Sequence, residues 1–295
     1  MLNIWTWNVN SVRGKVDNVR ELLALEKIDV LFLTETKILK KHEGELNFGK
    51  EYAVIFNSNI NSYHHGVAFV YRKDKVKMTL ISNELPVFHL VLNCKSENGS
   101  RKNARIFDKT TAKEVVETCK KAHKTEGRIL TVKCEFNGET VVIVGTYVPN
   151  SGVNRNDPLL RLPYRTLSWD KDLYTHLLNL EKEYGKVIWL GDLNVAKNDN
   201  DLYNIKSNCA GTTFEERNNM NKFIETSKWI DTWHVLNPNI THFKDRCTYG
   251  VNTFCKLRLD YVICSPNLEK NLYSSFSRQT FPSSDHCPMG TKFKF

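Results

Sequence analysis

Apolar residues recur along the chain in two patterns, as short runs and at helical spacing. The short runs predict strands, because apolar or β-branched stretches bounded by polar turns fit a buried strand. They lie at 2–9, 30–35, 66–72, 77–82, 87–93, 128–136, 140–148, 187–192, 258–264 and 289–295. The helical spacing predicts helices over 15–27, 168–184 and 213–227, the last with Thr212 or Thr213 as its N-cap.

Strands outnumber helices, and some neighbouring strands are joined by short turns. Asn137-Gly138, next to the run that starts at 140, is a strong hairpin signal. Strands joined in this way exclude a doubly wound parallel sheet and favour an α+β fold, in which two mixed β-sheets pack face to face with helices on the outside. The chain of 295 residues is long enough for a large core. We expect residues 1–295 to form a single domain without internal repeats.

One polar stretch, at about 94–127, stands apart from this pattern. It is rich in Lys and Arg, and residues 108–124 fit an amphipathic helix with Val115, Val116 and Cys119 turned inward. Charged runs are usually solvated faces, so a solvated insertion between strands is the favoured interpretation. The alternative is an additional basic surface near nucleic acid.

The charge balance is basic. The chain has 42 Lys and Arg against 33 Asp and Glu, a net charge of +9. Basic proteins often bind polyanions, because neutralising phosphates releases counterions. The alternative is that this charge only keeps the protein soluble.

Cysteine usage and hydropathy restrict the compartment. The eight cysteines form no C-x-x-C pair and no zinc-type spacing with histidine, so we expect reduced, structural thiols. No run reaches the ~18 apolar residues of a membrane helix. The first residues, MLNIWTWNVNSVRGK, lack a secretory leader. We therefore expect an intracellular protein that does not enter a membrane.

Six predicted strands end in, or are followed by, polar residues that can do chemistry. These ends carry Asn8 and Asn10, Glu35 and Lys37, Tyr147 and Asn150, Asp192 and Asn194, Asp260, and Ser284-Asp285-His286. Such a set at one edge of a sheet pair suits metal-assisted attack on a phosphodiester. Hard oxygen ligands such as Glu35 and Asp285 suit Mg²⁺, a carboxylate such as Asp192 can activate water, and a His held by an Asp can stabilise an oxyanion. No G-x-S-x-G elbow or P-loop is present, which argues against serine and nucleoside-triphosphate hydrolysis.

The stretch VIWLGDLNVA (187–196) defines this edge most clearly. Strand alternation would direct Asp192 and Asn194 to the same face and Leu193 back to the core. Two polar side chains on one face, two residues apart, could share a water and a phosphate.

Nine stretches, in order from end to end, resemble the exonuclease III family of apurinic/apyrimidinic (AP) endonucleases, within the endonuclease/exonuclease/phosphatase superfamily. They are WNVNSVR (7–13), DVLFLTETK (29–37), EGRIL (126–130), YVPNSG (147–152), RLPYR (161–165), VIWLGDLNVA (187–196), AGTTFEER (210–217), RLDYVICS (258–265) and SDHCP (284–288). The resemblance implies a four-layered α/β sandwich with the site at the strand ends, and leaves the 94–127 stretch as the main insertion.

The resemblance also implies roles for individual residues. Glu35 would be the principal Mg²⁺ ligand, with Mn²⁺ as a substitute, and Asn8 and Asp285 would lie close to the metal. Asp192 would activate the attacking water and Asn194 would orient it, both near the metal.

The remaining implied roles concern the phosphate and the DNA. His286, steered by Asp260, would hydrogen-bond the scissile phosphate, although Asp260 could instead pair with Arg258. Tyr147 and Asn150 would stabilise the phosphate or the leaving oxygen. DNA contacts are expected from three basic residues, Lys37, Arg128 and Arg161.

The implied activity is that of a class II AP endonuclease. A monomer acting on double-stranded DNA that contains abasic sites would cleave 5′ to the lesion and leave a 3′-hydroxyl. It would also have 3′-phosphodiesterase and 3′→5′ exonuclease activity, and would act where the DNA is, in a nucleus or in the cytoplasm of a prokaryote or of a cell infected by a cytoplasmic virus. The alternatives are a retroelement-type nicking endonuclease, a phosphatase of the superfamily, or a non-catalytic DNA-binding module. RLPYR and AGTTFEER favour the repair branch.

The chain departs from the family at three places. Asn10 stands where some members have Asp, and His65 precedes Gly66-Val67 where Ser is usual. An aromatic-rich segment becomes Arg-Cys-Thr-Tyr at 246–249. Candidates for a rebuilt wall around an extruded abasic sugar are Phe214, Tyr249, Phe254 and Leu257.

Overall fold

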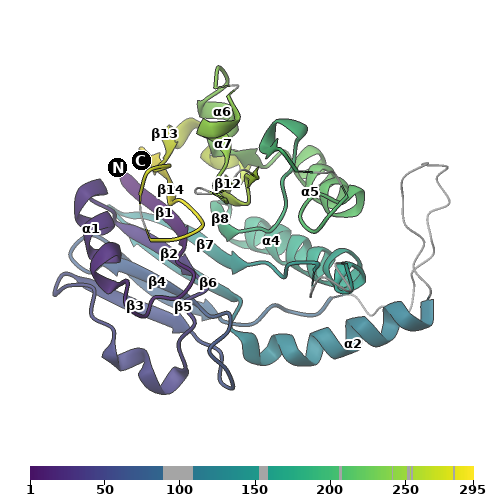
Figure 1. Ribbon diagram of the computed structural model, residues 1–295. Coiled ribbons are helices and arrows are strands. Elements are labelled where there is room, and N and C mark those ends of the chain that lie inside the picture. Colours follow the sequence, from purple (N-terminus) through teal and green to yellow (C-terminus); the bar gives the residue numbers. More distant parts are fainter. Residues whose placement is uncertain are drawn as a thin grey trace.

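The computed structural model describes residues 1–88, 109–152, 159–205, 208–240, 242–250, 253, 255–281 and 283–295. Two six-stranded mixed sheets form its centre (Figure 1). The first has the strand order β13 (Leu272–Ser277), β14 (Met289–Phe293), β1 (Leu2–Asn8), β2 (Val30–Thr34), β4 (Val67–Arg72), β3 (Tyr52–Asn57). The second has the order β10 (Ile230–Asp231), β12 (Asp260–Cys264), β8 (Val187–Asp192), β7 (Glu139–Tyr147), β6 (Ile129–Phe136), β5 (Lys77–Ser82).

Each sheet contains one parallel pair, and the other pairs are antiparallel. The parallel pairs are β1 with β2 and β7 with β8. Parallel strands point their carboxyl ends to the same edge of a sheet. Asn8 at the end of β1 donates to Asp192 at the end of β8 at 2.9 Å, so the polar ends of the two parallel pairs meet at one edge of the sheet pair.

Helices cover the outer faces, and three apolar clusters separate four layers. The cluster between the sheets includes Phe32, Phe69 and Leu190. A second cluster joins the outer face of the second sheet to α4 (Asp170–Tyr184) and α5 (Phe214–Ser227), and includes Trp189. A third packs α1 (Val16–Glu26) on the first sheet, through Leu22 among others. This arrangement confirms the predicted α+β sandwich.

Local signals located the long helices to within a few residues. α5 begins with the expected cap, where Thr213 Oγ1 accepts from Glu216 N at 3.3 Å and the Glu216 carboxylate accepts from Thr213 N at 3.1 Å. The 168–184 prediction becomes α4, preceded by α3 (Leu162–Tyr164) and a π-helical turn (Arg165–Trp169). The smaller elements are α6 (Thr232–Leu236), α7 (Phe243–Arg246) and the strand pair β9 (Leu202–Tyr203) with β11 (Lys256–Leu257).

Two predictions fall partly outside the described residues. The expected strand at 87–93 is wrong at Val87 and Phe88, which are irregular, and residues 89–93 are not described. Of the 94–127 stretch, residues 109–126 form α2 (Lys109–Glu126), with Val116 buried as expected. α2 runs along one border of the molecule, and its C-terminal end meets β6 (Figure 1).

Two further expectations concern the cysteines and the helices. Among the seven described cysteines no two form a disulfide with each other, and Cys94 lies outside the described residues. Among the described helices none combines the length and the apolarity that crossing a membrane requires.

Candidate active site

Three predicted site residues lie side by side in the second sheet. Asp192, the last residue of β8, pairs in register with Tyr147 of β7 on one side and with Asp260 of β12 on the other. The close approach depends on Gly191, whose φ is +135°, because a Cβ there would lie 1.9 Å from the Thr146 carbonyl oxygen. Only glycine tolerates this geometry, so it fixes the position from which Asp192 projects.

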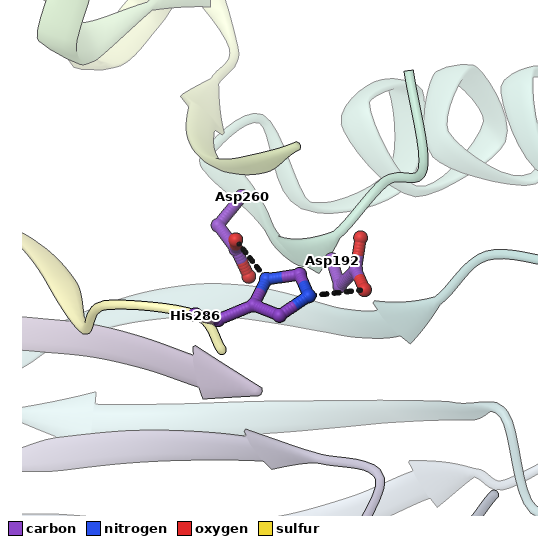
Figure 2. Close-up of side chains that lie close together, drawn as sticks. All are labelled: Asp192, Asp260 and His286. Carbon is purple, nitrogen blue, oxygen red and sulfur yellow. Dashed lines mark hydrogen bonds and ion pairs between the residues drawn. The ribbon is translucent and has the colours of Figure 1, made fainter. Parts of the chain in front are cut away.

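His286 joins the two carboxylates of this row (Figure 2). Its Nδ1 lies 2.7 Å from Asp260 Oδ2, and its Nε2 lies 3.9 Å from Asp192 Oδ2. All three side chains are buried. The alternative partner of Asp260 is ruled out, since Arg258 binds Asp231 through two hydrogen bonds of 2.8 and 2.5 Å.

Backbone contacts hold the segment that carries His286. Trp7 Nε1 donates to the His286 carbonyl at 3.1 Å, and Ser284 Oγ donates to the Asn8 carbonyl at 2.7 Å. The segment thus connects β1 of the first sheet to the row in the second sheet.

Glu35 supplies the carboxylate on the first sheet. Its Oε1 accepts from Asn8 Nδ2 at 3.0 Å and from Tyr147 Oη at 2.8 Å. Its Oε2 lies 2.7 Å from Lys37 Nζ. Asn8 also donates to Asp192 Oδ2 at 2.9 Å, so this buried amide bridges the carboxylates of the two sheets.

Asn194 reaches the site through a turn. β8 ends at Asp192, and Asn194 has a left-handed φ of 49°. Its backbone N donates to Asp192 Oδ1 at 3.0 Å, and its side chain donates to the Val148 carbonyl at 2.8 Å. Strand alternation is therefore the wrong reason for its position, although Leu193 is buried as predicted. Asn150 Nδ2 donates to Asn194 Oδ1 at 3.0 Å, which joins two predicted site residues.

Several residues around the site have left-handed backbones that L-residues rarely adopt. They are Asn10, Glu35, Lys37, His65 and Asn194, with φ between 44° and 61°. Such conformations cost energy and persist where surrounding contacts enforce them, as at active sites.

Asp285 differs from the other carboxylates because it is exposed. Its Oδ1 accepts from Asn10 Nδ2 at 3.2 Å, and Asn10 Oδ1 accepts from Lys37 Nζ at 2.5 Å. Asn10 and Lys37 therefore connect Asp285 to Glu35 at the mouth of the site.

Burial and neighbouring charges separate the pKa values of these groups. Burial raises the pKa of Glu35, but hydrogen bonds from Lys37 and Asn8 outweigh it and bring the pKa to about 2. Burial raises the pKa of Asp192 to about 7, against the opposing effect of His286. Burial alone would lower the pKa of His286, but Asp260 and then Asp192 raise it to about 10. An anion, a group that titrates near neutrality and a cation therefore lie close together.

Two of the three basic residues expected to contact DNA are engaged within the protein. Arg128 is 2% exposed, forms an ion pair with Glu126, and donates to the Tyr147 carbonyl at 3.2 Å. Its guanidinium lies 4.8 Å from the centre of the Tyr147 ring. Lys37 binds Glu35, and Arg161 is half-buried. DNA contacts by all three stay predictions.

Sequence reasoning missed Arg165, which lies in the RLPYR stretch. This buried residue donates from Nη1 to the carbonyls of Pro149 and Leu193, at 3.3 and 2.9 Å, and from Nε to Asp170 at 2.6 Å. These carbonyls directly precede Asn150 and Asn194. Arg165 therefore clamps both turns, and only its place in the motif pointed to it.

The donor set suits a hard metal ion. Asp192, Asp260 and His286 bring their polar atoms within 4.8 Å of one another, but a cationic His286 has no free lone pair for a metal, so the carboxylates are the candidate ligands. Glu35 and Asp285 add carboxylate oxygens on the side open to solvent. Oxygen-rich sites of this kind fit Mg²⁺ or Mn²⁺ better than zinc.

Part of the expected pocket wall is also present. The Tyr249 ring lies 4.9 Å from the His286 ring, and Tyr249 packs in an apolar cluster with Leu257 and Leu259. Phe214 starts α5 and is not a member of this cluster, and Phe254 lies outside the described residues.

Comparison with known proteins agrees with this geometry. The sequence model of the endonuclease/exonuclease/phosphatase family matches residues 5–286. The chain belongs to this family. A DNA-(apurinic or apyrimidinic site) endonuclease of Dictyostelium discoideum is 30% identical over 298 residues, which cover 98% of this chain and 70% of that protein.

Other known proteins are similar to this chain over different lengths. The DNA repair nuclease APEX1 of Danio rerio is 37% identical over 175 residues, 58% of this chain and 53% of that protein. An exodeoxyribonuclease of Bacillus subtilis is 26% identical and covers 98% of both chains. The fold matches that of the AP endonuclease LMAP from Leishmania major, with a TM-score of 0.76 and 24% identity over all of this chain and 88% of the other.

Proposed function

We propose that this protein is a Mg²⁺-dependent nuclease that hydrolyses the phosphodiester 5′ to an abasic site in double-stranded DNA and leaves a 3′-hydroxyl. The observation that carries the proposal is His286, bound between Asp260 and Asp192, with Asp192 linked through Asn8 to Glu35. These residues place a proton acceptor, a cationic hydrogen-bond donor and an anionic metal ligand around the position of one phosphate.

Asp192 is the group that accepts the proton of the attacking water. Its pKa of about 7 suits a general base at neutral pH. Asn194 lies beside it, bound to Asp192 Oδ1 through its backbone N, and orients the water with its side chain.

His286 donates a hydrogen bond to a non-bridging oxygen of the scissile phosphate. With a pKa of about 10 it is cationic at neutral pH, so it stabilises the charge that develops in the transition state. Asp260, 2.7 Å away, holds the ring in place and keeps it charged.

Glu35 is the principal metal ligand, supported by Asp285. A bound Mg²⁺ supplies a Lewis acid that polarises the phosphate and neutralises its charge, and Mn²⁺ can replace it. Asn8 donates its amide hydrogens to Glu35 and Asp192, and its Oδ1 accepts from Asn10 N at 3.0 Å. Asn8 therefore acts mainly by aligning the carboxylates of Glu35 and Asp192 near the metal. Asn194 also lies near the metal.

Tyr147 and Asn150 act on the phosphate and on the leaving oxygen. Burial raises the pKa of Tyr147 well above 10, so its hydroxyl stays protonated and can donate. Asn150 is oriented by its bond to Asn194. Lys37 and Arg161 contact the DNA, whereas Arg128, being buried, supports Tyr147 from behind.

The substrate preference rests on the wall next to His286. Tyr249, supported by the buried Leu257, can pack against a sugar extruded from the duplex, and an abasic nucleotide has no base to unstack. We further propose 3′-phosphodiesterase and 3′→5′ exonuclease activity, an inference that the relatives named endonuclease and exodeoxyribonuclease support. The protein would act as a monomer wherever the DNA is.

The test is incision of a duplex that carries one abasic analogue, with Mg²⁺ or with EDTA. The proposal is supported if the duplex is cut 5′ to the analogue only when Mg²⁺ is present. A DNA polymerase should then extend the new 3′ end, because that end carries a hydroxyl. Intact duplex and an inositol phosphate serve as competing substrates. Faster hydrolysis of either competitor would assign the protein to another branch of the family.

A further inference from the structure

A cleft of about 650 Å³ lies beside the active site and plays no part in the chemistry described so far. The C-terminal half of α2 forms one wall, with Lys120, Lys121 and Lys124. The segment 82–87, which follows from β5, forms another, and Arg128 also lines the cleft. The cleft is therefore lined both by α2, which belongs to the 94–127 stretch, and by Arg128, which contacts Tyr147.

The cleft contains more cations than anions. Its carboxylates are Asp172, which lies 3.8 Å from Lys120, and Glu84. Lys121 and Lys124 are exposed and have no ion-pair partner within the described ranges. A lysine nearer the start of α2 differs, because Lys113 lies 4.0 Å from Glu117. The uncompensated charge is thus concentrated where the surface is concave.

The lysines are held in a fixed relation to the catalytic site. The last turn of α2 accepts hydrogen bonds from the loop between β3 and β4, from Ile60 N to the Thr125 carbonyl and from Gly66 N to the Glu126 carbonyl, both at 3.1 Å. Gly127 follows with a φ of +62°, and a Cβ there would lie 2.1 Å from the Asn57 carbonyl oxygen. This junction tolerates no side chain and fixes the direction in which α2 leaves the sheet.

Only two side chains separate the cleft from the metal ligand. Arg128 lines the cleft and lies 4.8 Å from the centre of the Tyr147 ring, and Tyr147 Oη lies 2.8 Å from Glu35 Oε1. The cleft is therefore connected to Glu35 through two consecutive side-chain contacts.

We propose that this cleft binds the phosphodiester backbone of the DNA substrate to one side of the scissile bond, with Lys121 and Lys124 neutralising two phosphates. The inference rests on the proposed function. Lysines without counterions in a concave surface match a polyanionic strand, and their contacts are independent of base sequence. The α2 insertion is then an additional DNA-binding arm, contrary to the interpretation favoured from the sequence.

The experiment measures DNA affinity in EDTA, where no incision occurs, for the double variant Lys121→Gln/Lys124→Gln across a range of salt concentrations. Losing two phosphate contacts makes the negative slope of log K against log salt shallower by about 2. The difference in affinity between the wild type and the variant therefore shrinks about tenfold between 50 and 200 mM salt. Lys121→Arg/Lys124→Arg, which keeps the charge, should retain wild-type affinity.

The matched control is Lys73→Gln/Lys77→Gln, which removes the same charge from two exposed lysines outside the cleft and outside α2. Lys77 pairs with Glu135 at 2.9 Å, at the opposite end of β5 from Ser82. The control should keep the wild-type slope. An equal loss in both double variants, or wild-type binding by the cleft variant, would overturn the inference. So would a fall in the thermal unfolding temperature of the cleft variant without a change in affinity.

These outcomes are separable from the proposed function. If the wild type binds duplex DNA with the steeper slope but does not incise abasic DNA, the function is wrong and the cleft assignment stands. If incision occurs and the slope is unchanged in the cleft variant, the proposed function stands and the cleft assignment is wrong.

Discussion

Asp192 and Asp260 are paired in register on neighbouring antiparallel strands, and both carboxylates contact the same imidazole. Two buried carboxylates this close would repel each other without a cation between them. His286 provides that cation, which is why its pKa is raised to about 10 in spite of its burial. The register of β8 and β12 therefore sets the protonation state of the site.

Replacing Asp260 by Asn should lower the pKa of His286 from about 10 toward its ordinary value, because the strongest interaction that raises it is lost and burial then dominates. A group with a raised pKa keeps its proton until the pH exceeds that pKa, so the alkaline limb of activity should move to lower pH in the variant. NMR titration of the imidazole in metal-free protein, together with the pH profile of kcat/KM, measures both effects. An unchanged imidazole pKa would contradict the role of Asp260.

Arg165 should be a positioning residue for Asn150 and Asn194. Arg165→Lys keeps a charge beside Asp170 but cannot reach all three acceptors, so we expect kcat to fall about 10–100-fold with a smaller change in KM. Arg165→Met should cost about 3–5 kcal/mol of unfolding free energy, because it leaves the buried Asp170 carboxylate without its ion-pair partner. If Arg165 had a purely structural role, Arg165→Lys would lower kcat only as far as it lowers the amount of folded enzyme.

Arg20→Met is the control for the stability measurement. Arg20 pairs with Asp17 at 2.8 Å on the surface, where the two side chains are 45% and 93% exposed. Its loss should change the unfolding free energy by less than about 1 kcal/mol in urea denaturation.

Gly191→Ala should destabilise the protein by at least about 2 kcal/mol. The variant would adopt an unfavourable φ of +135° and would press its Cβ against the Thr146 carbonyl. Gly138→Ala is the control, since Gly138 also has a positive φ but a Cβ there has no neighbour within 4 Å. Urea denaturation of both variants gives the comparison, and equal losses would show that the contact with β7 is unimportant.

The sequence predicted the sandwich because short apolar runs, hairpin signals and helix caps are local properties. Asp192 and Asp260 could also be identified, since one ends and the other begins an apolar run, whereas the role of His286 came from the resemblance of the SDHCP stretch. The turn that carries Asn194 could not, because it depends on hydrogen bonds to Asp192 and Val148.

Arginines were the hardest residues to interpret from the sequence. A basic residue near a predicted site can contact either DNA or a buried acceptor, and the choice depends on partners that are distant in sequence. Arg128 donates to the Tyr147 carbonyl, 19 residues away, and Arg165 donates to two carbonyls that lie 16 and 28 residues from it. Only the folded chain reveals these partners.

The most direct test of Asp192 as the general base is single-turnover incision of an abasic duplex in Mg²⁺ by Asp192→Asn, compared with wild type. Asp199→Asn is the matched control, because Asp199 is 90% exposed and paired only at the surface with Arg217. We expect a loss of about 10²–10⁴-fold for Asp192→Asn with DNA binding retained, and wild-type rates for Asp199→Asn. Incision by Asp192→Asn at the wild-type rate would contradict this role.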